Sequence, residues 1–123
     1  MKKLELIALE GIPLIKPGDD IVEIIFTSLE GNKFQLKDGD ILVIAQKIIS
    51  KSENRYAYLN KIIPTVTASR LSKETDKDPK LVQLILDEST KVVRHKKGVI
   101  VVEHKLGFVH ANAGIDRLSL IHI

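Results

Sequence analysis

Three short segments of this 123-residue chain contain residue types that could bind a ligand. In the first, Leu9 to Asp20, glycine and proline after an apolar run can leave backbone N–H and C=O groups open to a ligand. In the second, Asp38 to Lys51, an apolar run leads to Lys47 and Lys51, whose spacing could let them meet successive phosphate groups as point charges. Taken alone, the first segment is more simply a structural turn, and the second a solvated lysine edge.

The third segment, His110 to Asp116, places small residues and a glycine before a carboxylate. Small side chains between Asn112 and Asp116 allow a tight loop, and a carboxylate is a hard oxygen ligand suited to Mg²⁺ or Mn²⁺ carrying substrate phosphates. Asparagine and aspartate are also common turn formers, so the loop by itself is mostly a structural signal. The residue types identify no catalytic residue.

The sequence lacks several common site patterns. No Gly-x-x-x-x-Gly-Lys-Ser/Thr phosphate loop, no Gly-x-Gly-x-x-Gly after a strand and no serine nucleophile elbow occurs. The absence of cysteine excludes disulfides and Cys-ligated zinc or iron–sulfur sites. The histidines have no metal-ligand spacing, so we expect ordinary surface or edge-strand roles for His95, His104, His110 and His122.

The composition is that of an ordinary soluble globular protein, with 44% hydrophobic and 28% charged residues. No apolar run approaches the roughly 20 residues that span a bilayer, so we expect one compact cytoplasmic domain and no membrane partner. The net charge of +3 keeps a small basic nucleic-acid-binding module open as an alternative. Scattered lysines and an aromatic content of 4% do not favour groove tracking or base stacking, so no nucleic-acid partner is expected.

Helices and strands are expected in an irregular order, which predicts an α+β fold with a mixed sheet and short helices. Turn signals at Pro17–Gly18 and Asp38–Asp40 separate the first elements. Before the second turn, Asp20 and Glu23 have capping-box spacing and predict a short helix. The expected strands here are Leu4–Leu9 and the run Ile41–Ala45, which is apolar on both faces and should be central and buried.

The second half of the chain contains the strongest helix signal. Asp78 followed by Pro79 is an N-cap with proline at the first helical position, and the apolar residues behind it recur at helical spacing. A further helix is expected over Thr67–Thr75. Strands are expected over Val99–Glu103 and Phe108–Ala111, separated by a glycine turn.

Taken in this order, the three segments resemble the coenzyme F420-0:L-glutamate ligase family, the gamma-glutamyl ligases of the deazaflavin coenzyme. The resemblance extends from about Ile7 to Asp116 and is to the N-terminal portion of that fold. The matching residues are Glu10 to Pro13, Lys16 to Asp20, Asp38 to Asp40, Gln46, Lys47, Ser50, Lys51, Lys77 to Pro79, Glu88, Ser89 and Asn112 to Asp116.

The resemblance implies a GTP-dependent ligase that adds L-glutamate through an amide bond to the carboxylate of the deazaflavin coenzyme precursor. Such a reaction requires an activated carboxylate, as in an acyl phosphate, and depends on positioning and on charge neutralisation by metals and lysines. GTP as a substrate, Mg²⁺ or Mn²⁺, a place for a monovalent cation and a homodimer of the full-length protein are also implied. A related amide ligase acting on another carboxylate is the enzymatic alternative.

The resemblance assigns roles by position. At Gln46 and Lys47 the family often has small hydroxyl residues, and Asn54 stands where glycine is common, a mild departure because asparagine tolerates a left-handed backbone. The implied guanine contacts are Ile12, Pro13, Leu14 and Ile15, the implied ribose and phosphate contacts are Gln46, Lys47 and Lys51, and the implied metal ligand is Asp116.

After the position of Asp116, family members continue with a Ser-Asn pair and about as much chain again. Here Arg117 leads into residues 118–123, which match the translated end of a transposon used in sequencing libraries. We therefore expect residues 1–117 to be the nucleotide- and metal-binding portion and residues 118–123 to be a non-native tail. Such a fragment is expected to lack ligase activity, and to be poorly soluble or to associate through uncovered strand edges.

Overall fold

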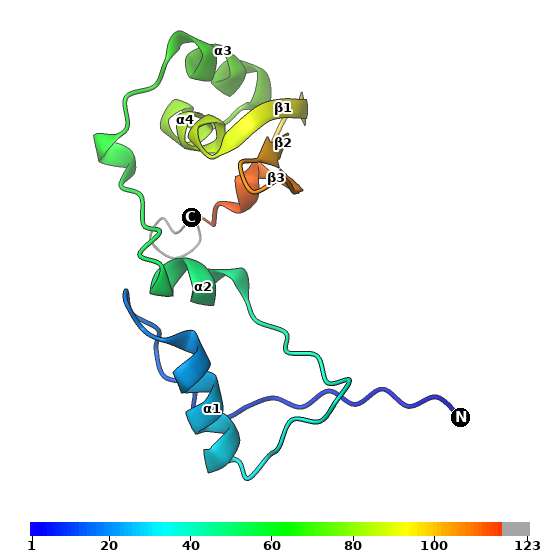
Figure 1. Cartoon of the computed structure of the whole chain (residues 1–123). Coiled ribbons are helices and arrows are strands. Elements are labelled where there is room, and N and C mark those ends of the chain that lie inside the picture. The colour runs from blue at the N-terminus through cyan, green and yellow to red at the C-terminus, as the bar shows by residue number, and fades with distance from the viewer. Residues whose placement is uncertain (117–123) are drawn as a thin grey trace. The chain divides into compact units, whose positions relative to one another are not determined.

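The computed structural model describes residues 1–116; Arg117 and the expected tail, residues 118–123, lie outside the described residues. The chain divides into two compact units, Met1–Arg55 and Tyr56–Ile123 (Figure 1). Both units contain helices, and the second also contains a three-stranded sheet. The predicted α+β class is confirmed. The sheet in the described part of the chain is antiparallel, because tight turns join its successive strands.

Helix α1, Ile21–Gly31, begins where the sequence predicted a helix in the first unit. The carboxylate of Asp20 caps it by accepting hydrogen bonds from the backbone N–H groups of Val22 and Glu23, at 2.9 and 3.1 Å. These bonds satisfy two of the four donors that a helix N-terminus leaves without partners. The predicted cap and helix are confirmed.

Two turns of the first unit, Lys16–Asp19 and Lys37–Asp40, have the same construction. In each, the aspartate N–H donates to the lysine carbonyl, at 3.1 and 3.0 Å, and the aspartate carboxylate accepts from the lysine N–H, at 2.7 and 2.8 Å. The third residue is a glycine, Gly18 or Gly39, with φ of +87° and +94°, which residues with a Cβ rarely adopt. Both predicted turns are confirmed.

The two strands predicted for the first unit are wrong for this chain. Leu4–Leu9 and Ile41–Ala45 form no strand, and the run predicted to be buried is open to solvent, with Ile41 and Val43 85% and 89% exposed. A strand needs backbone partners and cover for its faces, and the described residues supply neither the pairing nor full cover. A short helix that the sequence did not predict, α2 (Gln46–Ser52), follows the second run directly.

The second unit begins with a 3₁₀ turn, η1 (Leu59–Lys61), and continues with two capped helices. Thr65 accepts the Ala68 N–H at the start of α3, Val66–Thr75. Asp78 accepts the Lys80 N–H at 2.8 Å at the start of α4, Pro79–Asp87, with proline at the first helical position. Both predicted helices are confirmed.

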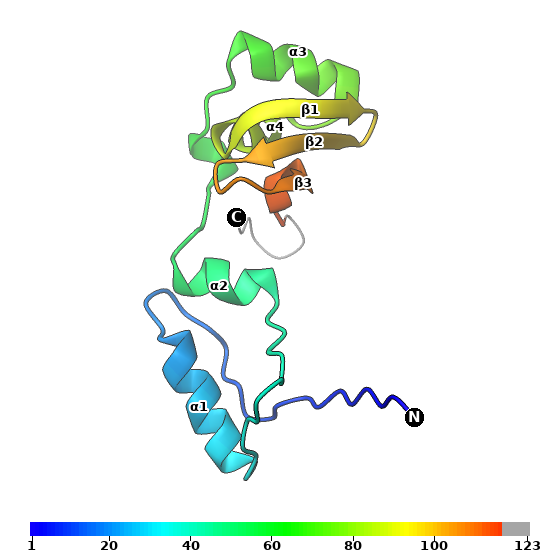
Figure 2. The same cartoon turned by 45° about the vertical axis from the view of Figure 1, so that its right-hand side comes forward.

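The sheet of the second unit has the strand order β1-β2-β3, formed by Ser89–Lys96, Val99–His104 and Val109–Ala111. The strands predicted over Val99–Glu103 and Phe108–Ala111 are confirmed within a residue or two. Strand β1 was not predicted, because its residues do not alternate between apolar and polar. Figure 2 shows the ribbon of the sheet beside α3 and α4.

A hydrophobic core joins α3, α4 and β2 with the loop that follows β3. Alternate residues of β2 are buried, as expected for the central strand of a sheet with one covered face. The buried members of the hydrophobic core are Ala68, Leu71, Leu81, Val82, Ile85, Ile100, Val102 and Ala113. All of them lie in the second unit, so this unit holds the hydrophobic core cluster of the described residues. No helix within residues 1–116 is long and apolar enough to cross a membrane.

Candidate functional site

The first two segments singled out by sequence come together in the first unit. The backbone N–H of Gly18, in the first turn, donates to the carbonyl of Ser52 at the end of α2, at 2.8 Å. Near the start of the first segment, the Glu10 carbonyl accepts a hydrogen bond from the hydroxyl of Ser28 in α1, also at 2.8 Å. The loop from Glu10 to Gly18 is therefore held at both ends by hydrogen bonds to helices.

Between these anchors lies the backbone of Ile12–Ile15. Within residues 1–116, no hydrogen bond is made by the main-chain groups of these four residues. Backbone N–H and C=O groups strongly favour having partners, so an anchored loop with none can recognise a polar ligand. This is the arrangement that glycine and proline in the segment suggested.

The side chains of the same four residues point to different places. Ile12 and Ile15 line an apolar cavity, and Pro13 lines a second hollow against α1. Leu14 is 87% exposed. The structure therefore brings Ile12 and Ile15 together at the cavity and places Pro13 and Leu14 elsewhere.

The sequence predicted that the ribose and phosphate candidates follow the end of a strand. In the structure they lie on helix α2 instead. Gln46 is the first residue of the helix, while Lys47 and Lys51 are four residues apart and share one face. Lys47 is exposed and Lys51 is half-buried. Two ammonium groups on one helical face can approach neighbouring phosphates, which preserves the chemistry expected from the spacing.

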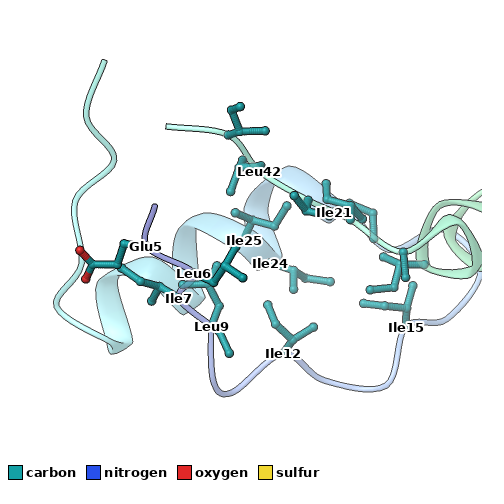
Figure 3. A pocket seen from close by; sticks show the side chains of 16 residues that line it. Glu5, Leu6, Ile7, Leu9, Ile12, Ile15, Ile21, Ile24, Ile25 and Leu42 are labelled. Carbon is teal, nitrogen blue, oxygen red and sulfur yellow. The ribbon is translucent and has the colours of Figure 1, made fainter. Parts of the chain in front are cut away.

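The apolar cavity of the first unit has a volume of about 520 Å³. Figure 3 shows aliphatic side chains from α1 and from the segments on either side of it directed toward a common space, with the Glu5 carboxylate turned outward at one edge. The residues that line the cavity are Glu5–Leu9, Ile12, Ile15, Ile21, Ile24, Ile25, Ile41–Ala45 and Ile48. A cavity with this lining suits an apolar group and not a triphosphate.

The third segment, in the second unit, contains an unusual backbone. Asn112, Ala113 and Gly114 form η2 and have φ of +52°, +54° and +71°, three successive residues in the left-handed region. The side-chain oxygen of Asn112 accepts the N–H of Ile100 at 3.2 Å, and Ala113 is 2% exposed, so strand and core hold the loop in place. Left-handed residues with a Cβ cost energy and persist where surrounding structure imposes them, often at functional sites.

Asp116, the expected metal ligand, follows this loop and is half-buried. Within residues 1–116 there is no group of three or more histidine, aspartate or glutamate side chains that could hold a metal ion. Magnesium commonly uses one or two carboxylates together with water and substrate phosphate oxygens, so Asp116 fits as one ligand among several. Asp116 and the nucleotide candidates belong to different units.

The expectation for His104 is wrong, since this residue is buried at the end of the central strand. Its Nδ1 accepts the Leu106 N–H at 3.0 Å, and its Nε2 lies 3.5 Å from Glu88. The ring stacks on Phe108, with centroids 4.5 Å apart. His104 therefore stabilises the hairpin between β2 and β3, which leads to the third segment. The spacing of residues in the sequence does not indicate this role. His95 and His110 lie on edge strands, as expected, and His122 is outside the described residues.

The chain belongs to a family of ligases. Residues 11–120 match the family described as F420-0:Gamma-glutamyl ligase, and the chain is a member of it.

Curated proteins with a similar sequence match nearly the whole chain. The chain is 45% identical over 117 residues to the protein named Coenzyme F420:L-glutamate ligase from Methanothermobacter thermautotrophicus, covering 95% of this chain and 46% of that protein. The protein of the same name from Methanocaldococcus jannaschii is 43% identical over 121 residues, covering 97% and 46%. The chain thus spans about half the length of the curated relatives it matches.

Proposed function

We propose that this chain is the nucleotide-binding part of a GTP-dependent ligase that joins L-glutamate, through an amide bond, to the carboxylate of the deazaflavin coenzyme precursor. The observation that carries the proposal is the 45% identity, over 95% of the chain, to a protein named Coenzyme F420:L-glutamate ligase. Two features of the first unit support the proposal: the loop backbone of Ile12–Ile15, which forms no hydrogen bond among the described residues, and the two lysines on one face of α2.

In this proposal the backbone of Ile12–Ile15 recognises guanine, Gln46 contacts the ribose, and Lys47 and Lys51 neutralise the phosphates. The precursor carboxylate takes the terminal phosphoryl group of GTP, releasing GDP. The glutamate amine then attacks the acyl phosphate, forming the amide and releasing phosphate. Asp116, in the second unit, would contribute one ligand to a Mg²⁺ or Mn²⁺ ion, which would supply charge neutralisation when bound.

We also propose that the 123-residue chain alone does not complete this reaction. The relatives are about twice as long, and within residues 1–116 no group of three or more histidine, aspartate or glutamate side chains could hold a metal ion. The full-length protein would act as a homodimer. Release of phosphate from GTP by the isolated chain, dependent on both glutamate and the precursor, would contradict this part of the proposal.

The nucleotide assignment is tested by titrating the chain with a fluorescent GTP analogue and Mg²⁺. Lys51→Met should weaken binding roughly 10- to 150-fold, because a charged contact to phosphate contributes roughly 1.5–3 kcal/mol. Lys37→Met is the matched control, since Lys37 lies in the same unit and its turn uses only its backbone. Equal affinities for the two variants would remove Lys51 from the site.

The reaction is tested in a chimera in which this chain replaces the matched segment of the Methanothermobacter thermautotrophicus relative. We expect the chimera to add glutamate to the coenzyme precursor with GTP, as followed by mass spectrometry. A chimera that consumes GTP only with a different carboxylate would favour the related amide ligase. Salt-dependent binding of the chain to generic DNA, without binding of GTP, would instead favour the nucleic-acid module.

A further inference from the structure

The first unit exposes an apolar surface made by two segments, Leu4–Leu9 and Ile41–Ala45, which we call the open surface. Leu6 and Val43 are 87% and 89% exposed, although residues of this kind are usually buried. Both segments run as plain coil in Figures 1 and 2. Helix α1 contributes Ile21, Ile24 and Ile25 to the cavity they border, so it covers the open surface on one side only.

The backbone of the open surface also lacks partners. Within residues 1–116, neither segment forms a backbone hydrogen bond, apart from the Ala45 carbonyl, which accepts the Ile48 N–H at the start of α2. Unpaired N–H and C=O groups beside apolar side chains are the usual template for addition of a β-strand. A small polar ligand could pair with some of these main-chain groups but would leave the aliphatic side chains uncovered.

The residue pattern indicates what would cover this surface. Every residue from Ile41 to Ala45 is apolar, so both faces of this segment require burial, and both of its edges require hydrogen-bond partners. A second copy of the chain would bring the same two uncovered segments and would leave one edge of each unpaired. A different polypeptide with apolar strands of its own meets both requirements.

The relatives contain such additional polypeptide. This chain corresponds to 46% of the Methanothermobacter thermautotrophicus relative, so more than half of that protein lies outside the match. We propose that the open surface is a docking site for apolar, strand-forming segments of this remaining part of the ligase, which complete a sheet with Leu4–Leu9 and Ile41–Ala45. The inference is independent of the proposed nucleotide site.

The test compares hydrogen exchange of this chain alone and joined to the unmatched part of that relative, without nucleotide or glutamate. We expect amide protection over residues 4–9 and 41–45 to rise at least about tenfold in the joined protein. Val43→Lys should abolish most of this rise, because it would place a charge in an apolar interface. Ile63→Lys, at a similarly exposed position in the second unit, is the control and should change nothing.

Each other outcome overturns the proposal. Unchanged protection in the joined protein would show that the remaining polypeptide does not cover the open surface. Equal effects of Val43→Lys and Ile63→Lys would show that protection comes from elsewhere. Protection of the isolated chain that rises with its concentration and with its mass in light scattering would assign the surface to a second copy. Because no nucleotide is present, these outcomes leave the proposed function untouched.

Discussion

Glu103, on the central strand of the sheet, lies opposite Lys91 of β1. The Lys91 Nζ and the Glu103 Oε2 are 3.0 Å apart at directly paired positions. The hydrogen bond from Lys91, followed by the charge of that lysine, holds the pKa of Glu103 below its ordinary value, and Thr90 adds a smaller hydrogen bond. A pKa lowered by folding means that the pair stabilises the fold at higher pH and that this contribution is lost as the pH falls through the folded-state pKa.

Substituting Lys91→Met should therefore raise the pKa of Glu103 toward its ordinary value. The side-chain carboxyl resonance, followed by NMR across the acid range, measures this directly. Stability near neutral pH should change little, because both side chains are partly exposed and such pairs contribute little. Lys105→Met, in the exposed turn after β2, serves as the control. An unchanged Glu103 titration in Lys91→Met would show that the ion pair does not form in solution.

The loop between β3 and Asp116 shows how an element imposes a backbone that its residues do not prefer. Asn112 does two things there: it adopts φ of +52°, and its side-chain oxygen accepts the N–H of the buried Ile100. Asparagine suits both tasks because it tolerates the left-handed region and carries an acceptor. The two contributions can be separated by substitution.

We expect Asn112→Gly to lower the free energy of unfolding by about 1–3 kcal/mol, since it leaves the Ile100 N–H without its acceptor. Asn112→Ala should lower the free energy of unfolding by up to about 1 kcal/mol more than Asn112→Gly does, because alanine is also strained in the left-handed region. Urea denaturation monitored by circular dichroism measures both variants. If alanine proves as stable as glycine at this position, the left-handed conformation is not required in solution.

At the scale of elements, the sequence predicted what is determined locally. The caps at Asp20 and Asp78 and the glycine turns use residues within a few positions of each other, and all are present. Strand formation depends on distant partners. The run Ile41–Ala45 has the composition of a buried strand, yet it has no pairing partner among the described residues.

In the candidate site, too, features that depend on neighbouring residues could be predicted from the sequence, whereas contacts between distant residues could not. Its three segments could be found because their residue types are unusual at close spacing. Their contacts could not be predicted, because the Gly18 to Ser52 hydrogen bond joins two backbone groups that have no side-chain signature. The burial of His104 also depends on Glu88 and Phe108, which reach it through the pairing of strands.

At the scale of the whole molecule, the two units differ in how much they bury. In the first unit, the buried residues among 1–55 are Ser28, Leu29 and Ser50, whereas the second unit has a continuous aliphatic core. Hydrophobic burial is the main force that stabilises a folded unit. The chain should therefore be most resistant to opening in α4 and β2, and least resistant along the first unit.

Ile85→Ala tests this difference, because Ile85 of α4 is fully buried in the core of the second unit. Removing its side chain should cost roughly 2–5 kcal/mol from lost burial and the cavity left behind. Hydrogen exchange should speed up in α4 and β2 by roughly 30- to 5,000-fold, the equivalent of that loss, while α1 should keep its rates because its amides are expected to open locally. Val66→Ala, at an 89% exposed position, should change the free energy of opening measured by hydrogen exchange by less than about 0.5 kcal/mol. A matching acceleration of α1 in Ile85→Ala would show that its protection depends on the core of the second unit.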